Sequence, residues 1–179
     1  MATKIPKNKP PAANSFFHLP VVTDWQHLNA NAVVFGVPYG KHYPIGEFPN
    51  HQSFAPSALR AASPRIIIDR QSIDLDFQQG FCLNDLSVVD GGDIPFDGVD
   101  IQKHYDAAEN AVRFAIEHEI MPISVGGDDG ITNPVIRGLD VLSDITLIQI
   151  DAHLDWREER MESMTVIPAL CVVPQSKIT

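Results

Sequence analysis

The sequence predicts an α/β protein in which a parallel sheet is covered by helices on both faces. Three apolar runs have the length and composition of strands: residues 32–37, 121–125 and 145–150. Between the first two runs lie residues 101–119, where apolar side chains recur at helical spacing. Because parallel strands need long crossovers, strands that alternate with helices favour a parallel sheet with helices on both faces.

Residues 1–30 are expected to form a flexible N-terminal arm and lead-in. The first eleven are polar and rich in proline, without the apolar core of a signal peptide. After the first strand, residues 38–56 predict a long irregular loop, and loops of this length in compact domains are often functional. His42 and His51 in this loop could touch a substrate, although we expect surface positions for both.

The helix expected over residues 101–119 has one apolar face. Its apolar residues lie three or four positions apart: Ala108, Ala111, Val112, Ala115 and Ile116. Asp100 is the expected cap. His104 and His118 are expected to face solvent.

Asp151, His153 and Asp155 follow the apolar run 145–150 at alternate positions. A strand has a period of two, so these side chains would face the same way if the extended backbone continued. The carboxyl ends of strands are where open α/β sheets hold their ligands. Carboxylates with an imidazole suit Mn²⁺, Fe²⁺, Ni²⁺ or Zn²⁺, so the pattern predicts a metal site, with a solvated acidic loop as the alternative.

A second acidic segment, Gly-Gly-Asp-Asp-Gly at residues 126–130, follows the strand 121–125. The glycines allow a tight turn, and the next residues predict a short helix capped by Thr132 or Asn133. The alternative to a metal site is a structural turn in which the Asp128 side chain bonds to its own backbone. Two strands that both end in acidic clusters strengthen the prediction of a metal site.

These two motifs resemble the signature of the ureohydrolases, the family of arginase, agmatinase and guanidinobutyrase. The family pattern is Gly-Gly-Asp-His-Ser followed by Asp-Ala-His-x-Asp. Three further segments are similar to it: residues 35–38, 55–60 and 88–94. Asp90 and Asp93 in the last of these could approach the metal site, but a turn at Gly91–Gly92 would also explain them.

The resemblance implies a three-layer α/β/α fold with a mainly parallel sheet, the arginase-like fold. Residues 31–160 would be the N-terminal half of the ureohydrolase domain, so the sheet would be incomplete at its C-terminal side. The family generally forms homotrimers or homohexamers.

The resemblance also implies a pair of divalent metal ions, with Mn²⁺ as first choice and Ni²⁺ as the alternative. The implied ligands are Asp129, Asp151, His153 and Asp155, while Asp128 would hold the turn or orient a ligand. Asp129 stands where the family has a histidine, which shifts the site toward harder cations. The family's later Ser-x-Asp-x-Asp strand and its proton-relay histidine do not occur in the chain, so the catalytic residue is unknown.

The implied reaction is hydrolysis of a guanidino compound to urea and an amine, by a metal-bound hydroxide. Agmatine is the leading substrate, with guanidinobutyrate or guanidine as alternatives. We expect this truncated chain to be inactive by itself. Two other functions are a non-catalytic metal-binding or partner-binding fragment and a deacetylase of related fold, and the paired motifs argue against the deacetylase.

Residues 161–179 fit neither a helix nor the family and are expected to be an out-of-frame tail. Read in a shifted frame, codons for residues 161–175 are compatible with a segment that follows Asp-Ala-His-x-Asp in agmatinase-like proteins. We therefore expect a single-base insertion or deletion near codon 160, in the gene or its sequencing. A natural alternative terminus is the other interpretation.

Charge and composition indicate a cytoplasmic protein. The net charge is −10 and the pI near 4.9, which disfavours nucleic acid and anionic membranes and is compatible with a small cationic substrate. Cys82 and Cys171 alone support no disulfide framework, and no apolar run reaches the length of a membrane span.

Overall fold

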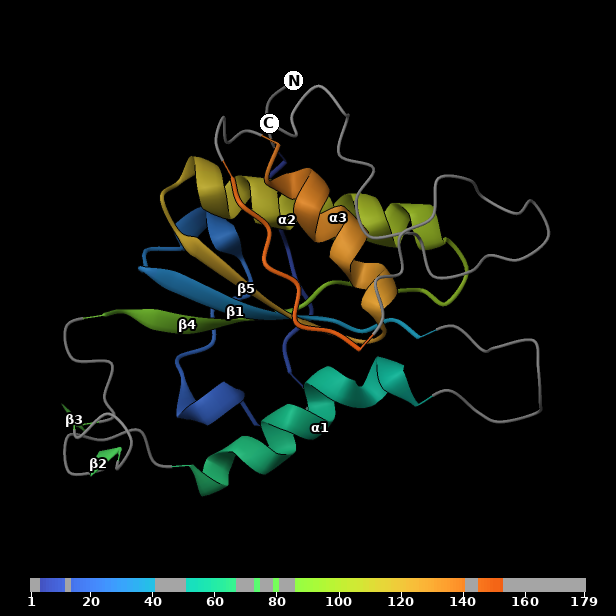
Figure 1. Cartoon of the computed structure of the whole chain (residues 1–179). Coiled ribbons are helices and arrows are strands. Elements are labelled where there is room, and N and C mark those ends of the chain that lie inside the picture. The colour runs from blue at the N-terminus through green and yellow to red at the C-terminus, as the bar shows by residue number, and fades with distance from the viewer. Residues whose placement is uncertain are drawn as a thin grey trace.

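A parallel sheet of three strands lies at the centre of the protein in the computed structural model (Figure 1). The structure describes residues 4–11, 14–40, 51–66, 73–74, 79–80, 86–140 and 145–152. The strands are β1 (Ala32–Val37), β4 (Val88–Asp93) and β5 (Met121–Gly126), in the order β4–β1–β5. Ala32 lies opposite both Val88 and Met121, so the three strands begin at one end of the sheet and finish at the other.

Helices cover both faces of this sheet. Helix α1 (Ala55–Ala62) lies on one face, and α2 (Ile101–Glu117) and α3 (Thr132–Gly138) lie on the other (Figure 1). The predicted three-layer α/β/α class is therefore confirmed over the described part of the fold. A separate two-stranded ladder pairs β2 (Ile73–Asp74) with β3 (Gln79–Gly80).

Helix α2 begins where its sequence predicts. The Asp100 carboxylate accepts a hydrogen bond from the Lys103 backbone N–H at 3.0 Å, which satisfies one of the free donors of the first turn. The predicted caps of α3 are wrong. Ile131 precedes α3 without a side-chain cap, because a 3₁₀ turn at Asp129–Ile131 leads directly into the helix.

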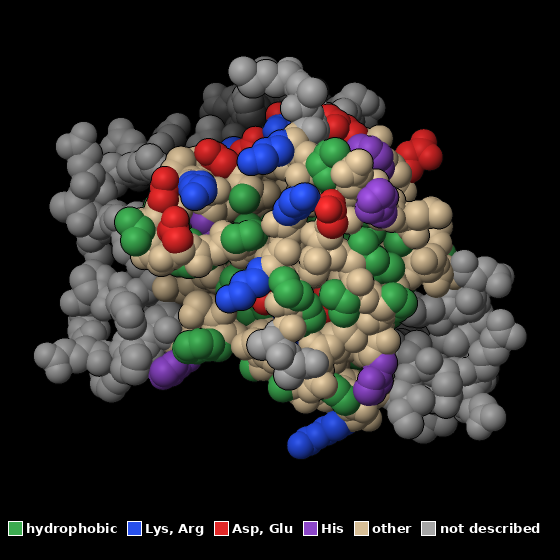
Figure 2. Space-filling view, turned by 180° about the vertical axis from the view of Figure 1, so that it is seen from behind, with side chains coloured by type: hydrophobic (Ala, Val, Ile, Leu, Met, Phe, Trp, Pro, Cys, Tyr) green, Lys and Arg blue, Asp and Glu red, His purple; other side chains and the backbone are tan. Residues whose placement is uncertain are grey.

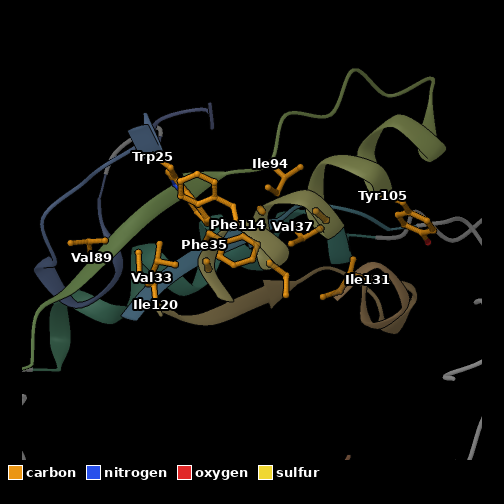
Figure 3. Close-up of a cluster of buried hydrophobic side chains, with 14 of the residues drawn as sticks. Trp25, Val33, Phe35, Val37, Val89, Ile94, Tyr105, Phe114, Ile120 and Ile131 are labelled. Carbon is orange, nitrogen blue, oxygen red and sulfur yellow. The ribbon is translucent and has the colours of Figure 1, made fainter. Parts of the chain in front are cut away.

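The core lies between the sheet and α2. The rings of Trp25, Phe35 and Phe114 pack together, with centroids 5.5 Å apart for Trp25–Phe35 and 6.1 Å for Trp25–Phe114 (Figure 3). Every residue of β1 is buried, as expected for the middle strand of a sheet covered on both faces. Burial of such aromatic rings is a large part of the hydrophobic stabilisation of a small core.

The segment expected to be a flexible arm is packed against β4 over its described residues. Lys9 and Asp93 exchange backbone hydrogen bonds of 2.8 Å. On the same strand, the Asp90 backbone N–H donates to the Pro20 carbonyl, and the Asp90 carbonyl accepts from the Val22 N–H. Because β4 is an edge strand among the described residues, this segment covers backbone groups that would otherwise be unpaired.

Residues 145–150 do not form the buried strand that their sequence predicts. They have no regular secondary structure and are exposed, with 80% of Ile148 and 97% of Ile150 accessible. A strand is stabilised by pairing and by cover on its faces, and among the described residues no strand pairs with this segment. In Figure 1 it is drawn as an orange coil without an arrow.

The surface carries both signs of charge. On the face shown in Figure 2, lysine and arginine side chains are interspersed with aspartate and glutamate and separated by apolar side chains. Among the described helices, none has the length and apolar character required to cross a membrane.

Candidate functional site

The carboxyl ends of β1, β4 and β5 meet at one edge of the sheet, because the three strands are parallel. The register of β1 and β4 shifts after Val34 and brings Asp93 opposite Gly36. A Cβ at Gly36 would overlap the Asp93 carboxylate and crowd Pro56, so only glycine leaves room for this aspartate. The acidic segment 126–130 follows β5 at this end of the sheet.

Asp128 closes the turn that follows β5. Its carboxylate accepts a hydrogen bond from the Gly130 backbone N–H at 3.0 Å, and only 6% of the residue is exposed. Its own backbone N–H donates to the Tyr39 carbonyl at 2.9 Å, which ties the turn to the end of β1. The prediction that Asp128 bonds to the backbone of its own turn thus describes its contacts. That Asp128 also orients a metal ligand stays a prediction.

The four implied metal ligands divide into two that the structure describes and two that it does not. Asp129 is half-buried at the start of the 3₁₀ turn, and Asp151 is exposed. His153 and Asp155 lie outside the described residues. Carboxylate oxygens are suitable donors for a hard divalent ion. Across the described ranges, no three His, Cys, Asp or Glu side chains come together as a metal group, so the predicted set stays a prediction.

A buried ion pair behind this edge was not predicted. Arg60 of α1, with 2% exposed, donates from Nε and Nη2 to the two Asp90 carboxylate oxygens at 2.8 and 2.9 Å. Its Nη1 donates to Asp93 at 2.6 Å, and the guanidinium lies 4.0 Å from the centre of the Phe16 ring. Burial alone would lower the pKa of Arg60, but the hydrogen bonds to Asp90 and Asp93 outweigh it and raise the pKa.

This ion pair gives Asp90 and Asp93 a structural explanation. Asp90 is fully buried and also accepts hydrogen bonds from the backbone N–H groups of Phe16, at 3.0 Å, and Gly92, at 2.9 Å. With both of its oxygens occupied, Asp90 is already satisfied as a carboxylate. The available sequence signal was an arginine in a short helix together with aspartates at a strand end, and that signal does not specify the pairing.

An aromatic cluster lies beside the Asp128 turn. The Tyr39 ring packs against Phe96, Tyr105 and His104, with centroids 5.9, 5.6 and 6.3 Å away. Figure 3 shows Tyr105 at the opposite end of the core from Trp25. Burial raises the pKa of the Tyr39 hydroxyl, and the nearby negative charge of Asp128 raises it further.

The expectation that His104 faces solvent is wrong. Only 1% of His104 is exposed, and its ring lies 4.7 Å from that of Phe96. Residue 104 is one helical turn before Ala108, so it extends the apolar face of α2, and the spacing contained that signal. His118, at the other end of the helix, is exposed as predicted.

Acid should destabilise the protein through His104. Burial lowers the pKa of this imidazole; within the described structure its Nδ1 has only the Pro95 carbonyl at 3.2 Å, and Nε2 has no partner. Unfolded histidine takes up a proton near pH 6.5 that the buried ring resists, so stability is full above that pH and falls below it. This group contributes a slope of up to about 1.4 kcal/mol per pH unit.

Urea unfolding between pH 7.5 and 5 measures this contribution. His104→Phe should remove it and flatten the acid side of the stability profile, whereas the same change at the exposed His27 should leave the slope as it is. Equal slopes for His104→Phe and the unsubstituted chain would contradict the assignment.

Comparison with known sequences gives one family match and a set of relatives. A family model described as the arginase family matches residues 30–171. An agmatinase of Bacillus subtilis is 30% identical over 135 residues, which cover 75% of this chain and 43% of the relative. An arginase of Oryza sativa is 28% identical over 137 residues, covering 72% of this chain and 38% of the relative. The chain thus spans less than half the length of these relatives.

Solved structures agree with the fold. A hypothetical agmatinase from Burkholderia thailandensis aligns with a TM-score of 0.65 and 27% identity, over 82% of this chain and 45% of that one. A formiminoglutamase of Trypanosoma cruzi, solved with Mn²⁺, aligns with a TM-score of 0.62 over 81% of this chain and 48% of that one. At 21% identity, this second likeness shows the fold alone.

Proposed function

The chain belongs to the arginase family, and from this membership we propose that the protein hydrolyses a guanidino compound to urea and an amine. The observation that carries the proposal is the family match over residues 30–171, which includes both acidic motifs. Similarity to the Bacillus subtilis agmatinase supports agmatine as the leading substrate. Guanidinobutyrate and guanidine are the alternatives, and a net charge of −10 is compatible with the guanidinium group that all three compounds carry.

Asp129, Asp151, His153 and Asp155 would hold two divalent metal ions in this proposal, with Mn²⁺ ahead of Ni²⁺. Bound metal ions would supply a water of lowered pKa as the nucleophile. The chain's own contribution is positional. Asp128 closes the turn that presents Asp129, through its hydrogen bond with the Gly130 N–H.

We propose that the activity belongs to a protein in which this half is joined to the rest of the fold. The 179-residue chain alone should release no urea, because its four proposed ligands are too few to enclose two ions. Residues 31–160 would be the N-terminal half of the domain and 161–179 an out-of-frame tail. The whole protein would be a cytoplasmic homotrimer or homohexamer.

The direct test compares the 179-residue chain with a version in which the shifted reading frame is restored and extended. Each protein is purified with Mn²⁺ and assayed for urea release from agmatine, guanidinobutyrate and guanidine. We expect urea from the restored protein only. A restored protein that binds two metal ions and releases urea from none of these substrates would contradict the proposal.

A partner-binding role is the second candidate function, and exposed apolar side chains favour it. Besides the segment 145–150, Met121 and Ile123 of β5 are 63% and 41% exposed. Exposed large apolar side chains are typical of a surface that another polypeptide covers when they form one patch. A soluble 179-residue chain that binds an intact ureohydrolase subunit, with no activity after frame restoration, would favour this role over catalysis.

A further inference from the structure

We infer that Tyr39 is a positioning residue for Asp129, and that the rings of Phe96, His104 and Tyr105 hold Tyr39 in place. The inference rests on the proposed function, because it takes Asp129 to be a metal ligand. It adds a residue that carries no ligand atom and that neither acidic motif contains. Its basis is the contact between the end of β1 and the turn after β5.

The turn after β5 lies directly on the peptide of Tyr39. The Asp128 backbone N–H donates to the Tyr39 carbonyl at 2.9 Å. A Cβ on Gly127 would overlap that same carbonyl oxygen and would lie 2.9 Å from the Tyr39 nitrogen. Glycine is therefore required at position 127 because the two backbones are in contact. Asp129 is the next residue after this contact, so a shift of Tyr39 is passed to it through one peptide.

The side chain of Tyr39 fixes the position of that peptide. Tyr39 is 7% exposed, and its ring packs against three others. Phe96 lies between β4 and α2, and His104 and Tyr105 belong to α2. Tyr105 and Phe96 meet it edge-on, with interplanar angles of 73° and 74°, a favoured geometry for aromatic pairs. His104 and Tyr105 belong to the first two turns of α2, which Asp100 caps. The loop after β1 is thus anchored to α2 through Tyr39, the second residue after the strand.

This anchorage matters because a metal ligand tolerates little displacement. A functional group must be held within about 0.5 Å of its working position, and sites on loops need support from packed neighbours to achieve this. Asp129 is in a 3₁₀ turn of three residues, which has few backbone bonds of its own. The Tyr39 contact supplies part of the missing support from a second strand.

The packing of the ring, rather than its hydroxyl, carries this role. Tyr39→Phe should therefore keep the geometry, and Tyr39→Ala should release it. Phe114→Leu is the matched control, because Phe114 is a buried aromatic residue of the same core that packs on Trp25 at the far end. It loses core packing without touching the Asp128 turn.

The experiment measures Mn²⁺ affinity by calorimetry in the full 179-residue chain and in the frame-restored protein, with circular dichroism to confirm folding of each variant. We expect Tyr39→Ala to weaken binding at least tenfold, while Tyr39→Phe and Phe114→Leu stay within twofold. Amide exchange at Asp128 is the second readout and should accelerate in Tyr39→Ala alone. If Tyr39→Ala does not fold, Phe96→Ala replaces it, with an expected weakening of about threefold, because Phe96 is 37% exposed and its loss is milder.

Two failures are distinguishable. If Asp129→Ala weakens Mn²⁺ binding but Tyr39→Ala, or Phe96→Ala in its place, behaves like Phe114→Leu, the positioning role is overturned and the metal site stands. If neither the unsubstituted chain nor the frame-restored protein binds Mn²⁺, the proposed ligand set is overturned, and the role of Tyr39 falls with it.

Discussion

Replacing Arg60 with methionine is expected to destabilise the protein by about 3–5 kcal/mol, a large part of the stability of a typical domain. Methionine keeps much of the side-chain volume and removes the charge. Asp90, which is fully buried, would then be an anion without its cation, and Asp93 would lose its bond to Nη1. The cost comes from this uncompensated buried charge, because removing one partner of a buried ion pair is more destabilising than replacing both partners with apolar residues.

Urea unfolding monitored by circular dichroism measures the change in the free energy of unfolding. The matched control is Arg113→Met. Arg113 also pairs with two acids, Glu109 and Asp140, but its side chain is 25% exposed, so its loss should cost below about 1 kcal/mol. Adding Asp90→Asn to Arg60→Met should recover part of the loss. Equal stabilities of Arg60→Met and Arg113→Met would refute the importance of the buried pair.

Replacing Asp151 with alanine should weaken Mn²⁺ binding by at least about 100-fold, since removing a group that merely supports a metal ligand costs 10–100-fold. In the frame-restored protein, urea release at a fixed low Mn²⁺ concentration should fall in parallel and recover partly at high Mn²⁺. Asp151 is exposed, so the substitution should leave the free energy of unfolding of the metal-free chain nearly unchanged.

Asp106→Ala is the control for charge. Asp106 is an acid on α2 that accepts a hydrogen bond from Gln102 at 2.6 Å, and its removal changes net charge by the same amount. It should leave Mn²⁺ affinity within twofold. An affinity of Asp151→Ala equal to that of Asp106→Ala would remove Asp151 from the proposed ligand set.

The elements with a strong local pattern were predictable. Helix α2 has an apolar face and a capping aspartate, and both determine where it begins. Strand β1 has six consecutive buried residues, and their apolar composition can be read from the sequence without knowledge of the neighbouring strands. In each case the sequence carries the information within one element, because the period or the cap is local.

Two of the wrong expectations concern contacts between distant parts of the chain. The N-terminal segment is polar and rich in proline, so composition predicts an arm. Its backbone nevertheless bonds to β4 over some eighty positions, as in the hydrogen bonds between Lys9 and Asp93. The segment 145–150 has the opposite problem. Its apolar composition predicts a strand, but a strand needs a neighbour, and composition does not provide one.

The candidate site also combines local contacts, which the sequence predicts, with long-range contacts, which it does not. The turn at Asp128 follows from two glycines and an aspartate, and its hydrogen bond to Gly130 is local. The pairing of Arg60 with Asp90 and the contact of Tyr39 with Gly127 join different strands and helices, so no spacing in the sequence predicts them. The complete ligand set lies partly outside the described residues and stays a prediction.

The packing of the N-terminal segment on β4 has a consequence for synthesis on the ribosome. The Phe16 backbone N–H bonds to an Asp90 oxygen that lies 74 positions later. At about 5–20 residues per second, the ribosome needs about 4–15 s to make that partner. During this interval Phe16 and Trp25, both buried in the finished fold, remain without cover on the nascent chain. The segment that holds Phe16 and Trp25 therefore reaches its native position only after β4 has been made.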